Sequence, residues 1–112
     1  MKIYHNPRCT KSRETLALIK EEGIEPEIVE YLKTVPDNKE LKNLLAKLNL
    51  KATDILRKGE KIYKENFKDK DFAEEEWIQI MTENPKLIER PIVVRGNKAV
   101  IGRPPENVKE LF

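Results

Sequence analysis

The stretch KIYHNPRCTKSRETLALIKEEGIEPEIVEYL (residues 2–32) decides the fold of this chain. Residues 2–4 form an apolar opening typical of a short strand, and the following Asn-Pro favours a turn. A helix is then predicted as far as Gly23, because suitable residues recur at steps of three or four: Cys9, Ser12, Leu16 and Ile19. Residues 27–32 are rich in strand formers. This order predicts a βαβ unit with parallel strands and a right-handed crossover.

The middle of the chain predicts helices without strands. In residues 36–50, Asp37 and Glu40 form a capping-box pattern, and four leucines at helical spacing make one apolar face. Residues 53–67 predict one or two short polar helices that are interrupted by Gly59.

A further helix is predicted over residues 71–85. We expect Asp71 and Glu74 to cap its N-terminus, and Pro85 lies beyond its end. Its inward face is expected to consist of Trp77, Ile80 and Met81.

The C-terminal third returns to strand patterns. Two β-branched runs, residues 91–94 and 99–101, flank a Gly-Asn turn and predict a hairpin. A final helix follows, with Pro105 in its first turn. The whole order predicts an α/β, thioredoxin-like fold in which a mixed four-stranded sheet is built from a βαβ half and a ββα half. We expect one domain over residues 1–112, with a helical insertion of about residues 36–85 between the two halves.

Composition limits the classes of function. The chain has 112 residues and a net charge of +2, with acidic and basic residues mixed along it, which argues against a nucleic-acid surface. No segment approaches the roughly 20 apolar residues of a membrane span, and no signal peptide is evident. A single cysteine cannot form an internal disulfide, so we expect a cytoplasmic, reducing environment.

The only cysteine and the only histidine of the chain, Cys9 and His5, stand four residues apart. A thiol reacts as thiolate, and the predicted helix N-terminus would favour that anion. Arg8 and Arg13 add positive charge, and His5 and Ser12 can add hydrogen bonds. The alternative is a buried cysteine that serves as a small apolar residue. The polar sequence around Cys9 makes an activated thiol beside an anion pocket the better interpretation.

Several familiar sites are disfavoured by the same segment. Ser12 occupies the second cysteine position of a Cys-x-x-Cys redox site. A low-molecular-weight tyrosine phosphatase loop needs arginine six residues after its cysteine, and Thr15 stands there. One thiol and one imidazole are too few for zinc, so no metal site is predicted. No glycine-rich nucleotide loop is present.

Arginine is rare in this chain, with six arginines beside sixteen lysines. Its planar fork of donors suits two-point contact with an oxyanion. Arg90 and Arg103 each precede a proline, which stiffens the backbone beside them. Arg95, in the hairpin turn, is expected to be a solvated surface charge. In thioredoxin-like folds a cis proline at the position of Pro91 faces the active-site loop, and the alternative is an ordinary trans proline at a strand start.

Four segments together resemble the glutaredoxin-coupled arsenate reductase family, most closely its short chromosomal branch. They are YHNPRCTKSRETL (4–16), ILRKGE (55–60), ERPIVV (89–94) and IGRPPE (101–106). The resemblance implies reduction of arsenate to arsenite in arsenic detoxification, with arsenate or a related oxyanion as the anion that binds. It also implies glutathione as a co-substrate, glutaredoxin as a partner and no bound cofactor.

The resemblance also implies roles for individual residues. Cys9 would be the nucleophile, His5 would help to ionise it, and Ser12 would donate to the thiolate or its adduct. Three arginines would hold the oxyanion: Arg57, Arg90 and Arg103. Asn6 and Arg13 match the motif and would shape the substrate-binding loop.

Two other functions remain open on the sequence. One is a Spx-type transcriptional regulator that binds RNA polymerase and shares this fold. The other is a thiol oxidoreductase that acts on glutathione mixed disulfides. Ser12 argues against the regulator, because those proteins usually carry Cys-x-x-Cys as a redox switch.

Overall fold

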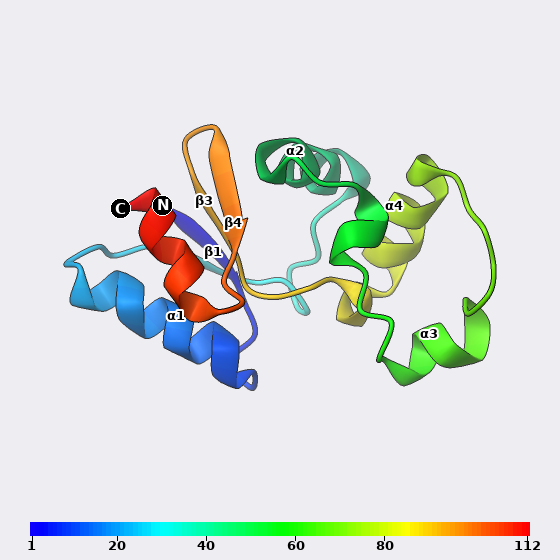
Figure 1. Cartoon of the computed structure of the whole chain (residues 1–112), viewed down its shortest axis with the longest axis horizontal. Helices are drawn as coiled ribbons and strands as arrows, with labels where there is room; N and C mark the ends of the chain where they lie inside the picture. The colour runs from blue at the N-terminus through cyan, green and yellow to red at the C-terminus, as the bar shows by residue number, and fades with distance from the viewer. The chain divides into compact units, whose positions relative to one another are not determined.

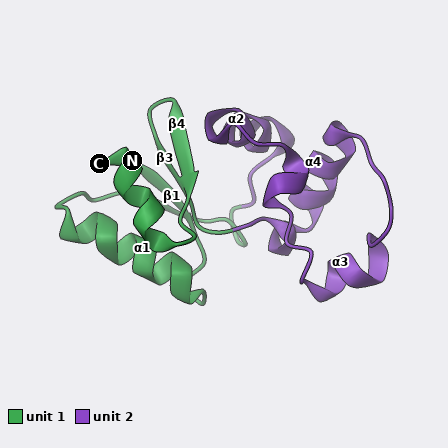
Figure 2. Cartoon of the chain, viewed as in Figure 1, with its two compact units in different colours: residues 1–34, 90–112 green, residues 35–89 purple.

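The structure is a computed structural model that describes residues 1–112 (Figure 1). It divides into two compact units (Figure 2). Unit 1 comprises residues 1–34 and 90–112 and holds every strand. Unit 2 comprises residues 35–89 and is helical. None of the helices combines the length and the apolar character needed to cross a bilayer.

The sheet of unit 1 has four strands in the order β2-β1-β3-β4. They are β1 (Lys2–His5), β2 (Glu27–Glu30), β3 (Ile92–Arg95) and β4 (Lys98–Ile101). β1 pairs with β2 in parallel and with β3 antiparallel, and β3 and β4 form the hairpin. The mixed four-stranded sheet and the thioredoxin-like fold predicted from the sequence are confirmed.

The core of unit 1 lies between the sheet and two helical segments, α1 (Thr10–Glu21) and η3 (Pro105–Leu111). Figure 1 shows η3, in red, beside α1, in blue. Strand residues in mutual register supply one side of this core and helical residues the other: Ile3, Val93, Val100, Ile19, Val108 and Leu111. The final helix predicted from Pro105 is a 3₁₀ helix, and Phe112 beyond it is exposed.

Unit 2 consists of short helices that share their own apolar contacts. They are α2 (Asn38–Leu48), η1 (Ala52–Ile55), α3 (Lys61–Asn66), α4 (Glu74–Glu83) and η2 (Pro85–Leu87). α2 and η1 both pack on α4. The predicted cap of α2 is confirmed, since the Glu40 N–H donates to Asp37 Oδ1 at 2.8 Å.

The predicted start of α4 is wrong. The helix begins at Glu74 after Ala73, and Asp71 lies outside it. The Ala73 N–H donates to the Glu76 carboxylate at 3.0 Å, while the Glu74 carboxylate accepts the Ala52 N–H at 2.9 Å. The Glu74 carboxylate, predicted from local sequence to cap α4, is therefore used in a tertiary contact with Ala52 instead. The inward face also differs, because Ile78 is buried with Trp77 and Met81, whereas Ile80 is half-buried.

These two helix starts give a paired stability test. Replacing Asp37 by alanine removes the acceptor of the Glu40 N–H, and we expect it to lower the free energy of unfolding by about 1 kcal/mol. Asp71→Ala is the matched control and should change it by less than about 0.5 kcal/mol, because this exposed carboxylate caps no helix. Urea denaturation followed by circular dichroism measures both. Equal losses in the two variants would contradict this account of the caps.

Candidate functional site

Cys9 occupies the N-cap position of α1, directly after the loop that leaves β1. Its N–H donates to the Asn6 carbonyl at 3.0 Å, and its own carbonyl accepts the Arg13 N–H at 3.0 Å. The side chain is 8% exposed. The thiol therefore lies at the start of the helix, as predicted, and it is nearly enclosed.

Two of the predicted loop residues bind the loop itself. The Asn6 side-chain oxygen accepts the Arg8 N–H at 3.0 Å. The Arg13 guanidinium donates to the Pro7 carbonyl at 3.0 Å and to Thr10 Oγ1 at 3.3 Å. These contacts fix the turn that delivers Cys9 to the helix start.

His5 contacts Ser12 rather than Cys9. Its Nδ1 lies 2.6 Å from Ser12 Oγ, which also accepts the Asn6 N–H at 3.0 Å. Burial, reinforced by the charges of Arg13 and Lys20 and opposed by Glu30, lowers the pKa of His5. A neutral imidazole whose Nδ1 accepts a hydrogen bond from the Ser12 hydroxyl fits this geometry. The hydrogen bond of His5 thus goes to Ser12 and not directly to the sulfur.

The sulfur sits in a positive environment. Burial raises the pKa of the Cys9 thiol, but the Ser12 backbone N–H and the guanidinium groups of Arg90 and Arg103 outweigh it, so the pKa lies below its ordinary value. Arg103 Nη2 donates to Cys9 Sγ at 3.3 Å. The geometry from the Ser12 N–H to the sulfur is not that of a regular helix-capping hydrogen bond, although this N–H still lowers the pKa of the thiol. The Ser12 N–H is one of the backbone donors expected at the helix start, whereas the Ser12 hydroxyl, expected to donate to the thiolate, lies 2.6 Å from His5 Nδ1.

Arg90 and Arg103 reach Cys9 from two neighbouring segments of unit 1. Arg103 Nε donates to the Arg90 carbonyl at 2.7 Å, and the Gly102 N–H donates to the Pro91 carbonyl at 2.9 Å. The peptide bonds that follow both arginines are cis. Two of the three arginines selected from the sequence are therefore brought together at the thiol.

Arg57, the third arginine, belongs to unit 2. Its Nη1 forms an ion pair of 2.6 Å with Glu89, and its N–H donates to the Leu87 carbonyl at 2.7 Å. Its Nε donor is buried without a hydrogen-bond partner. The guanidinium thus has one carboxylate partner within its own unit, and its predicted oxyanion role stays a prediction.

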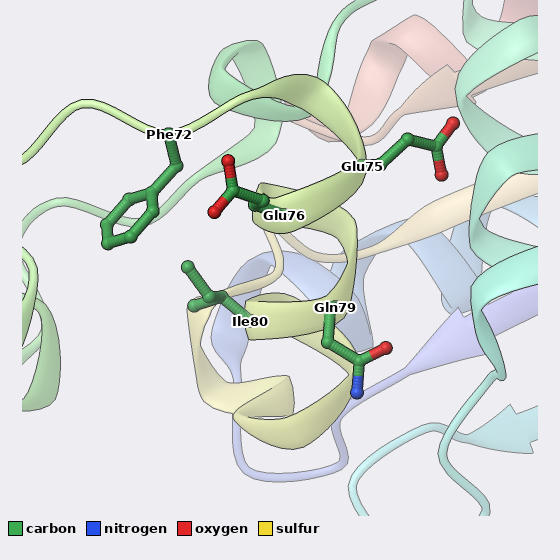
Figure 3. A pocket seen from close by; sticks show the side chains of 5 residues that line it. All are labelled: Phe72, Glu75, Glu76, Gln79 and Ile80. Atoms are coloured by element: carbon green, nitrogen blue, oxygen red, sulfur yellow. The ribbon is translucent and has the colours of Figure 1, made fainter.

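Unit 2 also contains a shallow hollow on α4 of about 350 Å³ (Figure 3). Its lining is acidic and apolar and consists of Phe72, Glu75, Glu76, Gln79 and Ile80. Glu75 is engaged by Lys42 at 2.7 Å, and Glu76 by the Ala73 N–H. Two glutamates make this hollow unsuitable for an oxyanion, and no group of His, Cys, Asp and Glu in the protein is arranged to hold a metal ion.

This chain is similar to known proteins over nearly its whole length. Residues 4–111 match the ArsC family. The uncharacterized protein YfgD of Escherichia coli K12 is 56% identical over 99% of this chain and 95% of its own length. An arsenate reductase of Haemophilus influenzae is 44% identical over 98% of this chain and 97% of its own length. The solved structure of an arsenate reductase from Vibrio cholerae superposes with a TM-score of 0.94 at 48% identity, covering 99% of this chain and 96% of that one. This chain belongs to the ArsC family.

Proposed function

We propose that this protein reduces arsenate to arsenite through a covalent adduct on Cys9, with glutathione and glutaredoxin as reductants. The observation that carries the proposal is the 3.3 Å contact from Arg103 Nη2 to Cys9 Sγ, with Arg90 as a second cation on the same sulfur. Relatives that bear the name arsenate reductase support the choice of arsenate.

The first step of the proposed reaction is nucleophilic attack. Arg90 and Arg103 favour the thiolate, and their remaining donors suit the oxygens of an incoming arsenate. The thiolate forms an arsenic–sulfur bond, and one arsenic oxygen takes up protons and leaves as water. Arsenic is still pentavalent in this adduct, so no electrons have yet been transferred.

The reduction requires two external thiols. Glutathione displaces a second oxygen as water and bonds to arsenic through its sulfur. A glutaredoxin thiolate then attacks that sulfur, and the two form a mixed disulfide while the electron pair of the arsenic–sulfur bond stays on arsenic. Hydrolysis of the remaining bond to Cys9 releases arsenite and restores the thiol. Cys9 is the only cysteine, which accords with reductants supplied from outside.

The other predicted residues take supporting roles in this proposal. Ser12 contributes its backbone N–H to the sulfur, and its hydroxyl is held by His5. Asn6 and Arg13 hold the loop. For Arg57 an oxyanion-binding role rests on the family resemblance alone.

A coupled assay tests the activity. With glutathione, glutaredoxin and glutathione reductase present, arsenate should drive NADPH oxidation, and Cys9→Ser should reduce the rate to that of the enzyme-free mixture. A glutathionylated peptide in place of arsenate, in the same mixture without glutaredoxin, tests the alternative oxidoreductase. Folded protein that turns over the peptide but not arsenate would reject the proposed substrate.

Thiol titration tests the role of the arginines. The rate of alkylation by iodoacetamide rises with pH as the thiolate forms, and the lowered pKa of Cys9 predicts a midpoint below the roughly 8.5 of a free cysteine. Arg103→Gln removes a cation in contact with the sulfur and should raise this midpoint by about one unit.

Arg95→Gln is the matched control for this titration. It removes the same charge from unit 1, but Arg95 donates to the Leu111 carbonyl at 2.9 Å and not to the thiol. The midpoint should therefore stay at the wild-type value. A shift of equal size in both variants would indicate a general effect of net charge and would refute the assigned contact.

A further inference from the structure

Residues 102–103 follow β4, and this segment packs against α1, the helix whose N-cap is Cys9. Thr15 lies on α1 less than two turns beyond Cys9, and its side chain is completely buried. Its hydroxyl donates to the Lys11 carbonyl at 2.8 Å and lies 3.4 Å from the Gly102 carbonyl. Helix and segment therefore meet directly at Thr15 and Gly102.

The contact leaves no space for a side chain at residue 102. A Cβ built on Gly102 would lie 2.8 Å from the Pro91 ring and 3.0 Å from Thr15 Cγ2, and it would also overlap Thr15 Oγ1. Gly23 and Gly96 are the glycines with a positive φ, and Gly102 is not among them. Close approach, rather than a left-handed backbone, is thus the reason for glycine here.

The segment is also held by hydrogen bonds. The Gly102 N–H donates to the Pro91 carbonyl at 2.9 Å, and the Asn107 side-chain amide donates to the Arg103 carbonyl at 3.1 Å. Arg103 Nε is bound to the Arg90 carbonyl, which restricts rotation of the guanidinium. The distance from Nη2 to the sulfur then depends on how closely residue 102 approaches α1.

We propose that Gly102 and Thr15 are positioning residues of the Cys9 site. Thr15 provides the surface of α1 that residue 102 contacts, and glycine at residue 102 lets the backbone come close to it. Together they hold the Arg103 guanidinium against the sulfur. Neither residue touches the thiol, so neither is catalytic. The catalytic purpose of this positioning rests on the proposed function. The Arg103–Cys9 contact itself does not depend on which anion the site binds.

Gly102→Ala tests this proposal through the alkylation midpoint of Cys9. The added methyl group would collide with Thr15 and with the Pro91 ring, so we expect the segment to shift. Withdrawal of Arg103 from the sulfur should then raise the midpoint by about one unit. Val100→Ala is the matched control, since it removes buried volume from the core of the same unit without touching the segment contact. It should lower the melting temperature and leave the midpoint unchanged.

A second pair of variants keeps the test decisive if Gly102→Ala does not fold. Thr15→Ala removes the side chain that contacts residue 102, and it should raise the midpoint by less than Gly102→Ala does. In the double variant Thr15→Ala/Gly102→Ala the clashes with Thr15 Oγ1 and Cγ2 are removed and only the close approach to the Pro91 ring is left, so the midpoint should lie closer to wild type than in Gly102→Ala. Wild-type midpoints in folded Gly102→Ala or in Thr15→Ala would overturn the proposal, because a purely structural role changes stability alone.

The same variants separate this inference from the proposed function. Arsenate turnover is measured beside the alkylation midpoint in each. Shifted midpoints in the variants, together with a wild-type protein that shows no arsenate turnover, would reject the reductase and support the positioning role. Turnover with unshifted midpoints would support the reductase and reject the positioning role.

Discussion

A nearly enclosed sulfur can be a thiolate only if positive groups compensate for its burial. In this protein the compensation comes from the Ser12 backbone N–H and from the guanidinium groups of Arg90 and Arg103. The first is local, because Ser12 lies in the opening turn of the helix that Cys9 begins. The arginines lie more than 80 residues further along the chain, so the fold must bring them to the thiol.

The sheet topology does this. β3 runs antiparallel to both β1 and β4. The C-terminal end of β1, the N-terminal end of β3 and the C-terminal end of β4 therefore lie at the same end of the sheet. The Cys9 loop leaves at the first of these points, Arg90 precedes the second and Arg103 follows the third. Three segments distant in sequence therefore converge at the same end of the sheet, although all of unit 2 lies between the first and the second along the chain. The terminal hairpin thus both completes the sheet and delivers the two cations.

Much of this arrangement could be predicted because its members are chemically unusual. Cys9 is unique in the chain, and Arg90 and Arg103 are rare arginines fixed beside prolines. Other features depend on tertiary partners that local sequence does not contain. Glu74 was predicted to cap a helix, but its carboxylate accepts the Ala52 N–H. His5 was predicted to act on Cys9, but its ring contacts Ser12. The need for glycine at residue 102 comes from side chains on two other segments, and no local pattern reports it.

The choice of arginine over histidine as the source of charge has a chemical consequence. A histidinium beside the thiol would lose its charge as the pH rises through its pKa, just where thiolate is needed. The lowered pKa of His5 makes it a poor cation at neutral pH, whereas guanidinium stays charged throughout this range. Stabilisation of the sulfur is then constant across neutral pH. In the proposed reaction the same guanidinium groups can pass from thiolate to arsenate oxygens as the arsenic–sulfur bond forms, so that negative charge stays compensated throughout the attack.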